Sequence, residues 1–350
     1  MEFRARVSEG LNEANFFTEL DWVKPQLTSA LGREPYPGTL NLTLSKDRLS
    51  IKDHWDKVSS SSTVKPAPGF CSAICYPVRV NGLVPAVIVL PEVDDYPADK
   101  IELVSPYRLR DLLSLSNGDE ISVSLEMRGG DRHLEGVIFD LEGTLVDFQW
   151  NLLEAEAELK GALLGLGFDE AILKDVDYAG IRKAAYVKEG FDREAISRID
   201  AALGPIYDKY DHDALDRWSE SSGAEELLRK LKENKFPIAM VSNIGREVGD
   251  KILDRFQWRG LFDVIITRND VALMKPDGEG IQKALELMSL SPDKAIMVGD
   301  SMSDLKAARA SSVKCAIIKG GEKEHRPLKG EKPDLYLESL LDLEGMFISP

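Results

Sequence analysis

Short segments of alternating apolar and polar residues, separated by glycine, proline and asparagine, fill the first part of the chain. Leu40 to Leu44 alternates with a period of two residues, which is typical of a half-buried strand. Tyr76 to Val80, the dipeptide Asn81-Gly82 and Val84 to Leu90 predict a β-hairpin. Ile121 to Leu125 alternates in the same way. Short strands joined by such turns favour a small closed or nearly closed β-barrel.

The pattern then changes to strands that alternate with helices. Val137, Ile138 and Phe139 predict a buried strand, and apolar residues recur with helical spacing from Asn151 to about Ser221. Strands alternating with helices indicate a doubly wound parallel sheet covered on both faces. The remaining strands are expected at 238–241, 264–266, 295–298 and 315–318, and the helices at 225–234, 248–256 and 279–288.

These patterns predict two domains, of which the second contains a helical insertion. The barrel is expected over residues 1–128, and the glycine-bearing polar stretch 129–134 is a plausible linker. The α/β domain is expected over 135–350. Its core comprises 135–148 and 222–350, and a helical cap comprises 149–221. The Ser- and Pro-rich stretch 59–68 predicts a loop.

Charge and composition narrow the functional classes. The formal net charge of −16 disfavours nucleic acids and anionic membrane surfaces as partners, because their phosphates are repelled at long range. No run reaches the roughly 18 apolar residues of a membrane helix, and Met1 to Arg6 lacks the apolar core of a signal peptide. We therefore expect a cytoplasmic protein, for which small-molecule partners, including anionic ones, are not excluded. Its oligomeric state is not predicted.

Three strands of the second domain end in polar side chains. Asp140, Ser242 and Asp300 each follow a predicted strand, and Lys275 lies in the loop after another. The carboxyl ends of parallel strands meet at one edge of a sheet, so these groups can converge. Two carboxylates, a hydroxyl and an amine can hold a phosphoryl group together with Mg²⁺.

This set resembles the haloacid dehalogenase superfamily of phosphotransferases over about residues 135 to 350. The resemblance implies a HAD-like phosphatase that acts on a small phosphomonoester through an aspartyl-phosphate. It also implies that cap residues contact the substrate, and Arg182, Tyr186, Tyr207 and Tyr210 are candidates for which packing is the simpler expectation. The implied roles are nucleophile for Asp140, acid/base for Glu142, phosphate binding for Ser242, Asn243 and Lys275, and Mg²⁺ binding for Asp140, the Glu142 carbonyl, Asp300 and Asp304.

The acid/base position departs from the usual pattern of that superfamily. Phosphatases of this kind carry Asp two residues after the nucleophile, where this chain has Glu142. Glutamate performs the same proton transfer, but its additional methylene moves the carboxyl by more than about 1 Å. Errors of about that size can cost roughly 100-fold in rate. The sequence therefore predicts a slower or differently shaped active site.

A second resemblance covers about the first 128 residues. Gly32 to Leu42, which contains the run Gly38-Thr39-Leu40-Asn41, is similar to the signature of the archaeal CTP-dependent riboflavin kinases, a cradle-loop barrel family. The resemblance implies phosphorylation of riboflavin to FMN with CTP and Mg²⁺. It assigns the metal to Thr39 and Asn41 and the flavin to Asp94 and Glu102. It assigns the nucleotide to Gly10, Leu11, Asn12, Glu13, Ala14, Asn15, Arg108, Leu109 and Arg110.

Three residues of this part depart from the family pattern. Asn12 and Ala14 replace glycines, whose missing Cβ lets the backbone approach phosphates. Asp94 stands where the family tends to have a hydroxyl, and its charge would repel a product phosphate. The leading interpretation is a bifunctional flavin-metabolism enzyme. The alternative is a single working phosphatase for a sugar phosphate or a phosphoglycolate-like substrate, with the barrel as a flavin or nucleotide sensor.

Overall fold

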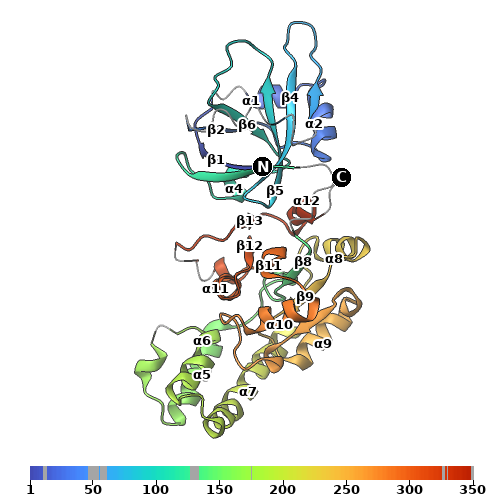
Figure 1. Cartoon of the computed structure of the whole chain (residues 1–350). Coiled ribbons are helices and arrows are strands. Elements are labelled where there is room, and N and C mark those ends of the chain that lie inside the picture. Colours follow the sequence, from blue (N-terminus) through green and yellow to red (C-terminus); the bar gives the residue numbers. More distant parts are fainter. Residues whose placement is uncertain are drawn as a thin grey trace. The chain divides into compact units, whose positions relative to one another are not determined.

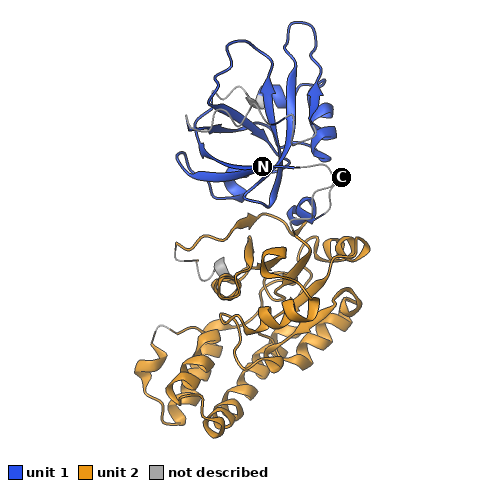
Figure 2. Ribbon diagram, in the orientation of Figure 1, with its two compact units in different colours: residues 1–133, 342–350 blue, residues 134–341 orange. Residues whose placement is uncertain are grey.

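The chain folds into two compact units (Figure 1, Figure 2). The computed structural model describes residues 1–10, 14–45, 55, 61–126, 134–174, 176–324, 328 and 330–347. Unit 1 comprises residues 1–133 and 342–350, and unit 2 comprises residues 134–341. The chain therefore crosses between the units twice. The predicted linker lies almost wholly outside the described residues.

Unit 1 is built on a closed barrel of six antiparallel strands, which confirms the predicted fold. Neighbouring strands pair in the order β4-β5-β6-β2-β1-β7, and β7 pairs back onto β4 to close the ring. Alternate residues of each strand face the interior, as in β1, where Phe3, Ala5 and Val7 are buried. The strands are β1 (Glu2–Val7), β2 (Leu40–Thr43), β4 (Ala73–Val80), β5 (Val84–Pro91), β6 (Lys100–Val104) and β7 (Glu120–Leu125).

The loop predicted for residues 59–68 contains a strand. β3 (Ser62–Val64) pairs with the first half of β4, outside the barrel ring. Its one inward side chain, Val64, joins a cluster with helix α2 (Lys24–Leu31) and strands β4 and β5. A three-residue strand carries too little periodicity to be recognised, and packing against α2 stabilises it. Two short helices, α1 (Ala14–Thr18) and α4 (Leu109–Leu112), complete the described helices of this part.

Unit 2 contains a parallel sheet, as the sequence predicts, with six strands, one more than the five expected. Its order is β10-β9-β8-β11-β12-β13, so the strand order reverses between the central neighbours β8 and β11. Ligands of such sheets bind beyond the carboxyl ends of the strands at this reversal. The strands are β8 (Gly136–Phe139), β9 (Ile238–Val241), β10 (Val264–Ile266), β11 (Ala295–Gly299), β12 (Lys314–Ile318) and β13 (Leu335–Leu337).

Two groups of helices surround this sheet. The first group lies next to the sheet and comprises α8 (Ala224–Glu233), α9 (Arg246–Arg255), α10 (Glu279–Met288) and α11 (Met302–Ala310). The second group forms the predicted cap between β8 and β9, drawn in green at one end of unit 2 (Figure 1). It comprises α5 (Leu152–Gly165), η2 (Glu170–Leu173), α6 (Tyr178–Lys188) and α7 (Arg193–Leu215).

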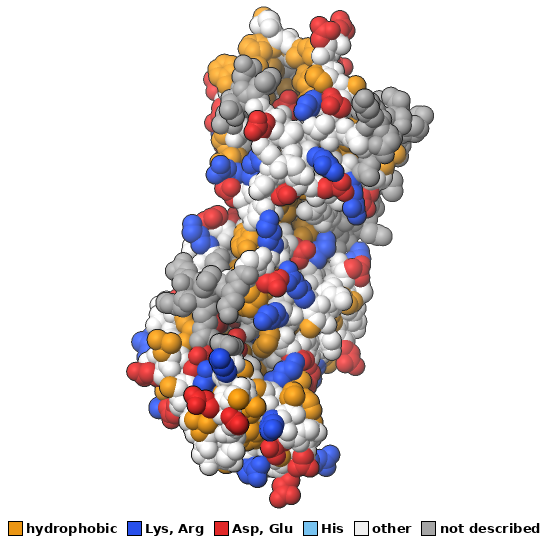
Figure 3. Space-filling view, turned by 90° about the vertical axis from the view of Figure 1, so that its left-hand side faces the viewer, with side chains coloured by type: hydrophobic (Ala, Val, Ile, Leu, Met, Phe, Trp, Pro, Cys, Tyr) orange, Lys and Arg blue, Asp and Glu red, His pale blue; other side chains and the backbone are white. Residues whose placement is uncertain are grey.

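The surface carries charges of both signs. On the face shown in Figure 3, acidic and basic side chains are interspersed, without a large area of either sign. The excess of acidic residues is therefore distributed over this face and not gathered into one patch. Among the described helices, none has the length and hydrophobicity needed to cross a lipid bilayer.

The last described residues of the chain belong to unit 1. Helix α12 (Glu344–Phe347) packs against β5, and Met346 and Phe347 are buried. The side chains of Arg33 and Glu344 form an ion pair of 2.9 Å. A Cβ added at Gly345 would lie 2.5 Å from the Tyr107 hydroxyl, so the backbone approaches the barrel closely. This division differs from the sequence-based one, which runs the second domain to residue 350.

We expect Met346→Ala to destabilise the barrel, because it removes a buried side chain between α12 and β5. The loss is about 2–5 kcal/mol of unfolding free energy, as for other truncations of buried methionine. Hydrogen exchange of β5 peptides in the full chain measures it. The control is Val93→Ala, at an exposed position of the same unit. Equal exchange in the two variants would show that α12 contributes nothing to the stability of the barrel.

Candidate active site

The site lies where the strand order of the unit 2 sheet reverses. Asp140 follows β8 and Asp300 follows β11, and these two strands are paired neighbours. Ser242 follows β9, on the other side of β8. The expected convergence of strand ends is therefore found. All three side chains are buried.

One ammonium group joins two of the buried carboxylates. Lys275 Nζ lies 2.7 Å from Asp140 Oδ1 and 2.6 Å from Asp304 Oδ1. Opposite charges at this distance, removed from water, attract strongly, and the pKa of Lys275 is raised because both carboxylates stabilise its charged form. Lys275 therefore stays protonated and fixes the position of the Asp140 carboxylate.

Asp304 is held by the start of α11. Its Oδ2 accepts hydrogen bonds from the Ser301 hydroxyl at 2.7 Å and from the Ser301 backbone N–H at 3.1 Å. In return, the Ser301 hydroxyl caps the helix by accepting from the Asp304 N–H. The second oxygen of Asp304 is thus used by the helix, and the first is used by Lys275. Asp304 positions the lysine in addition to its predicted place in the metal site.

Asp300 is enclosed by two glycines with left-handed backbone. Gly143 has φ 81° and Gly321 has φ 68°, and a Cβ on either would lie 2.2 or 2.1 Å from Asp300 Oδ2. Glycine adopts this conformation without steric cost, and it alone leaves this space. The backbone N–H of Glu322 donates to the same oxygen. Gly143 therefore serves the carboxylate as well as the turn that the sequence predicts.

The three carboxylates fit a divalent cation. Ligand oxygens of Asp140, Asp300 and Asp304 lie within 4.8 Å of one another. With one lysine among them, the ionised cluster has a charge of −2, and burial raises the pKa of Asp140 to about 6 and that of Asp300 well above its usual value. Between pH about 4 and 6, Asp140 is therefore still protonated in the folded protein but already ionised in the unfolded chain. Without a cation, the contribution of Asp140 to the free energy of unfolding decreases as the pH rises through this range. Mg²⁺ favours such oxygen ligands.

Asn243 and Ser242 occupy the loop after β9. The Asn243 amide donates to the Lys275 carbonyl at 2.9 Å and accepts from the Lys275 N–H at 3.0 Å. This side chain therefore fixes the backbone of the lysine. Ser242 lines the same cavity as Asp140 and Lys275. Its predicted phosphate contact, and that of Asn243, remain predictions.

Glu142 is held through one of its two carboxylate oxygens. Oε1 accepts from the Trp218 indole N–H at 2.9 Å and from the Gln149 backbone N–H at 3.0 Å. Burial raises the pKa of Glu142 to about 8, and the nearby charges of Asp211 and Asp140 act in the same direction. A carboxyl with this pKa retains its proton at neutral pH and can donate it.

The cavity above these groups is small, with a volume of about 20 Å³. This is room for about one water molecule, so a phosphomonoester does not fit into the cavity as it stands. Three cap residues, Trp150, Tyr178 and Asp211, line it, together with Phe148 just before the cap. The cap candidates from the sequence do not line this cavity. Arg182, for example, pairs with Asp200 at 2.9 Å, as expected for packing and surface residues.

Asp211 is the main residue of this site that the sequence did not indicate. Its carboxylate accepts from the Trp150 indole at 3.0 Å and from the Gly245 N–H at 2.7 Å, and it pairs with Arg268 at 2.9 Å. Asp211 belongs to the cap, whereas Gly245 and Arg268 belong to the core. This buried ion pair therefore joins cap to core beside the cavity. No local motif indicates it, because its partners are far apart in sequence.

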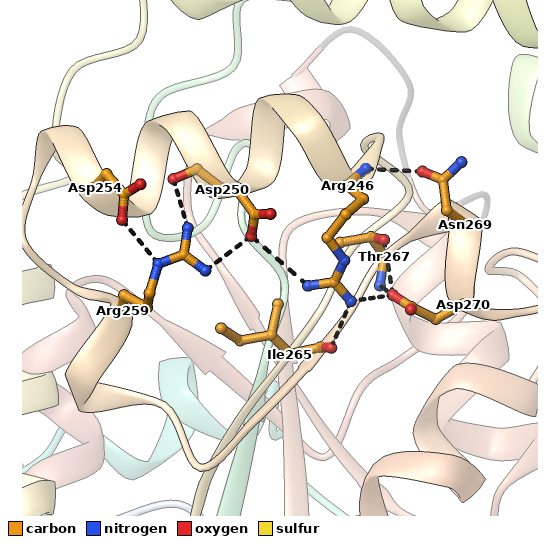
Figure 4. Close-up of polar contacts among 8 residues, drawn as sticks. All are labelled: Arg246, Asp250, Asp254, Arg259, Ile265, Thr267, Asn269 and Asp270. Atoms are coloured by element: carbon orange, nitrogen blue, oxygen red, sulfur yellow. Dashed lines mark hydrogen bonds and ion pairs between the residues drawn. The ribbon is translucent and has the colours of Figure 1, made fainter.

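The loop that carries Arg268 is itself fixed to α9 (Figure 4). Arg246, at the start of α9, donates to the Ile265 carbonyl at 2.9 Å and contacts Asp270. Asp270 accepts from the backbone and hydroxyl of Thr267, at 2.8 Å each. The network continues along α9 through ion pairs of Asp250 and Asp254 with Arg259. This network holds Arg268, the core residue of the ion pair with Asp211, in place.

Unit 1 contains a second cavity, of about 180 Å³. Thr39 lines it together with Arg108, Leu109 and Arg110, so one predicted metal ligand meets one predicted nucleotide segment. The Leu109 side chain is buried in α4. Arg110 donates to the Ser8 carbonyl at 3.1 Å and to Asn117 at 2.8 Å. The guanidinium of Arg108 pairs with Asp111 at the surface.

None of the other described residues predicted for the barrel site lines this cavity. Asn41 donates to the Thr39 hydroxyl at 3.3 Å and lies opposite Glu102 in the β2–β6 ladder. A Cβ on Gly10 would lie 2.3 Å from Asn41 Nδ2, so this glycine is required for close approach. Asp94 is exposed. Leu11, Asn12 and Glu13 lie outside the described residues, and of Ala14 and Asn15 only the backbone at the start of α1 is described.

Comparison with known proteins matches each unit separately. Residues 137–318 match the family model of haloacid dehalogenase-like hydrolases, and residues 7–125 match the model of CTP-dependent riboflavin kinases, described as a domain of unknown function, DUF120. Among relatives, phosphoglycolate phosphatase 1 of Pseudomonas aeruginosa is 29% identical over 215 residues, which are 59% of this chain and 77% of that protein.

Two riboflavin kinases are similar to the first unit. That of Saccharolobus solfataricus is 31% identical over 130 residues, which are 36% of this chain and 74% of that protein. That of Methanocella arvoryzae is 37% identical over 123 residues, or 35% of this chain. The chain spans only 56% of the length of the Methanocella protein. The similarity is therefore one of domains and not of whole proteins.

We expect Asp300→Asn to leave the metal-free protein as stable as the wild type or more stable, because it removes a buried charge without removing the acceptor for Glu322. Mg²⁺ should raise the unfolding free energy of the wild type by about 2–3 kcal/mol at a hundredfold excess over its Kd, and should not stabilise Asp300→Asn. Thermal unfolding with and without Mg²⁺ measures both effects.

The matched comparison is Asp304→Asn, which alters a carboxylate of the same cluster. This variant breaks the Lys275 ion pair and one half of the helix cap, so it should lose about 3–5 kcal/mol even without metal. Equal metal-free stability of the two variants would contradict the separate roles assigned to Asp300 and Asp304.

Proposed function

Because the chain belongs to the haloacid dehalogenase-like hydrolases over residues 137–318 and to the CTP-dependent riboflavin kinase family over residues 7–125, we propose that it is a bifunctional enzyme. Unit 2 hydrolyses a small phosphomonoester, and unit 1 phosphorylates riboflavin to FMN. The observation that carries the first activity is the buried Lys275 ammonium between Asp140 and Asp304 at the reversal of the sheet.

In the first step of the hydrolysis, Asp140 attacks the phosphorus atom. Lys275 holds Oδ1, so Oδ2 is the oxygen that forms the new O–P bond. The bond from phosphorus to the leaving oxygen breaks, and Glu142 donates its proton to that oxygen. The alcohol leaves, and Asp140 carries the phosphoryl group. Lys275 balances the negative charge that gathers on the phosphoryl oxygens.

In the second step, water hydrolyses the aspartyl-phosphate. Glu142, now ionised, takes a proton from the water, whose oxygen bonds to phosphorus while the bond to Asp140 breaks. Inorganic phosphate leaves, and Asp140 and Glu142 return to their starting states. Trp150, Tyr178 and Asp211 of the cap line the cavity and would limit the access of bulk water to the phosphoryl group.

Asp140, Asp300 and Asp304 are the side chains that would hold Mg²⁺ in unit 2, together with the Glu142 carbonyl. When bound, the ion neutralises the cluster and polarises the phosphoryl oxygens. The buried charge of this cluster supports the assignment. The similarity to a phosphoglycolate phosphatase favours small phosphomonoesters such as phosphoglycolate or a sugar phosphate as substrates.

In unit 1, Thr39 and Asn41 would hold Mg²⁺ and the phosphates of CTP. Their side chains are in hydrogen-bond contact, and Thr39 shares its cavity with Arg108 and Arg110. Neutral oxygens beside cationic side chains suit a nucleotide–Mg²⁺ complex. Glu102, which lies opposite Asn41 on the neighbouring strand, would contact the flavin. CTP is the phosphoryl donor, and FMN is the product.

A second candidate function makes unit 1 a sensor that binds flavin or nucleotide without phosphorylating it. Asn12, Ala14 and Asp94 favour it, because added side chains and a carboxylate oppose the approach of phosphates. Calorimetry with riboflavin and an FMN assay with CTP separate the two candidates. Binding without turnover supports the sensor.

We expect Asp140→Asn to lower phosphate release at least about 10⁴-fold, as removal of a nucleophile commonly does, with an unchanged circular dichroism spectrum. A Mg²⁺-dependent phosphate-release assay on phosphoglycolate and sugar phosphates measures the loss. The control is Asp293→Asn, at an exposed position of the 3₁₀ turn before β11, which should stay within about twofold of the wild type. Turnover retained by Asp140→Asn would exclude an aspartyl-phosphate at this residue.

We expect Thr39→Val to lower CTP-dependent FMN formation at least about 100-fold, because it replaces a metal-binding hydroxyl by a methyl group of the same shape. Riboflavin affinity should change little. Thr63→Val, at an exposed position of β3, is the control and should leave both quantities unchanged. A parallel loss of riboflavin binding in Thr39→Val would place the residue in the flavin site and not in the metal site.

A further inference from the structure

Glu142 is anchored by both segments that connect the cap to the core. Gln149 lies in the segment that leads from β8 to α5, and Trp218 lies in the segment that returns from α7 to α8. Both donate to the same atom, Glu142 Oε1, at 3.0 and 2.9 Å. One donor is a backbone N–H, and the other is the indole of a fully buried tryptophan. Only the indole can be removed by substitution.

Two donors on one oxygen decide where the carboxyl carries its proton. An oxygen that accepts two N–H bonds has both lone pairs occupied and cannot also bear the acidic hydrogen. The proton of a neutral Glu142 therefore resides on Oε2. Glu142 lines the cavity that contains Asp140 and Ser242. The anchoring thus leaves Oε2 as the oxygen that serves the reacting groups.

Trp218 is itself fixed by both the cap and the core. Its backbone N–H donates to the Ala214 carbonyl at 3.2 Å, and Arg255 donates to the carbonyls of Leu215, at 2.8 Å, and of Trp218. Arg255 ends α9, the helix that the network of Figure 4 holds against the sheet. The indole therefore has a defined position relative to the strand that carries Asp140.

The two connecting segments are also joined to each other. The Asp147 N–H donates to the Ser219 carbonyl at 3.0 Å, and the Ser219 N–H donates to Asp147 Oδ1 at 2.6 Å. Arg217 donates to the Gln149 carbonyl at 3.0 Å. Gln149 and Trp218 are thereby held at a fixed separation. The carboxylate between them must have the reach of a glutamate, because aspartate ends about 1.5 Å earlier, one C–C bond.

We propose that Trp218 is the positioning residue of the acid/base: its indole N–H occupies Oε1 of Glu142, so that Oε2 delivers the proton to the leaving oxygen. The indole and the additional methylene of Glu142 form a matched pair. This inference rests on the proposed phosphatase function. Trp218 does not touch the substrate, since among the described residues it is absent from the walls of the cavity.

The test compares two phosphate esters that differ in their need for a proton. In the first step, the Asp140–phosphorus bond forms, the bond to the leaving oxygen breaks, and Glu142 protonates that oxygen. Phenyl phosphate needs this proton, whereas p-nitrophenyl phosphate releases a stabilised anion and needs it little. The kcat/KM of each ester, measured with Mg²⁺ at neutral pH, reports this step.

The variants are Trp218→Phe, Glu142→Asp, Glu142→Gln and the double variant Glu142→Asp, Trp218→Phe. We expect Trp218→Phe and Glu142→Asp each to lower kcat/KM for phenyl phosphate by about 10- to 100-fold and for p-nitrophenyl phosphate by less than about threefold. Glu142→Gln should show the same selectivity with a larger loss. The double variant should be little worse than either single variant, because both remove one interaction.

Trp258→Phe is the matched structural control. Trp258 is equally buried in unit 2 and is absent from the described walls of the cavity. We expect it to change both esters by the same small factor. Equal losses on both esters in Trp218→Phe would reduce Trp218 to a structural role and overturn the inference. Fully additive losses in the double variant would overturn it as well.

Failure of the proposed function gives a different result. If Asp140→Asn retains turnover, or if Glu142→Gln affects both esters equally, the proposed mechanism is wrong. The inference is then overturned together with it. Selective loss in Glu142→Gln without selective loss in Trp218→Phe overturns the inference alone. If Trp218→Phe does not fold, Glu142→Asp decides, because it shortens the same contact without altering the core. Selective loss then supports the inference, and equal loss on both esters overturns it.

Discussion

The site in unit 2 depends on one ammonium group shared by two buried carboxylates. Lys275 lies within 2.7 Å of Asp140 and 2.6 Å of Asp304, and none of the three is exposed to water that could replace the contact. Removal of one partner would leave an uncompensated buried charge, which costs several kcal/mol. The surrounding hydrogen bonds hold this arrangement. Asn243 fixes the backbone of the lysine, and the cap of α11 fixes Asp304.

The same arrangement leaves negative charge in the interior. The ionised cluster has two more carboxylates than ammonium groups. A fold tolerates such a cluster at a cost in stability when the charge serves binding or catalysis. Gly143 and Gly321 provide space around Asp300 that a side chain would fill. The ion pair between Asp211 of the cap and Arg268 of the core holds the cap beside the cavity. Access to the charged groups therefore depends on how the cap is attached to the core.

The candidate site of unit 1 differs in charge from that of unit 2. Its candidate metal ligands are uncharged, and the antiparallel register of β2 and β6 places Asn41 opposite Glu102. Pro77 lies in β4 between the residues that pair with β3 and those that pair with β7, and its carbonyl accepts from the Glu126 N–H at 2.9 Å. The end of the chain, through Met346 and Phe347, adds to the apolar contacts of this barrel.

Both folds, and the polar groups at the strand ends, could be predicted from the sequence. A buried strand before Asp140 or Asp300 is a local pattern, and parallel strands must bring their carboxyl ends to one edge. The Asn81-Gly82 turn is equally local, and both residues have positive φ. The partners of Glu142 and Asp211, the placement of α12 and the strand β3 could not be predicted and are seen only in the structure. Trp218 is 76 residues from Glu142 along the chain, and such contacts depend on packing between distant segments, which leaves no periodicity in the sequence.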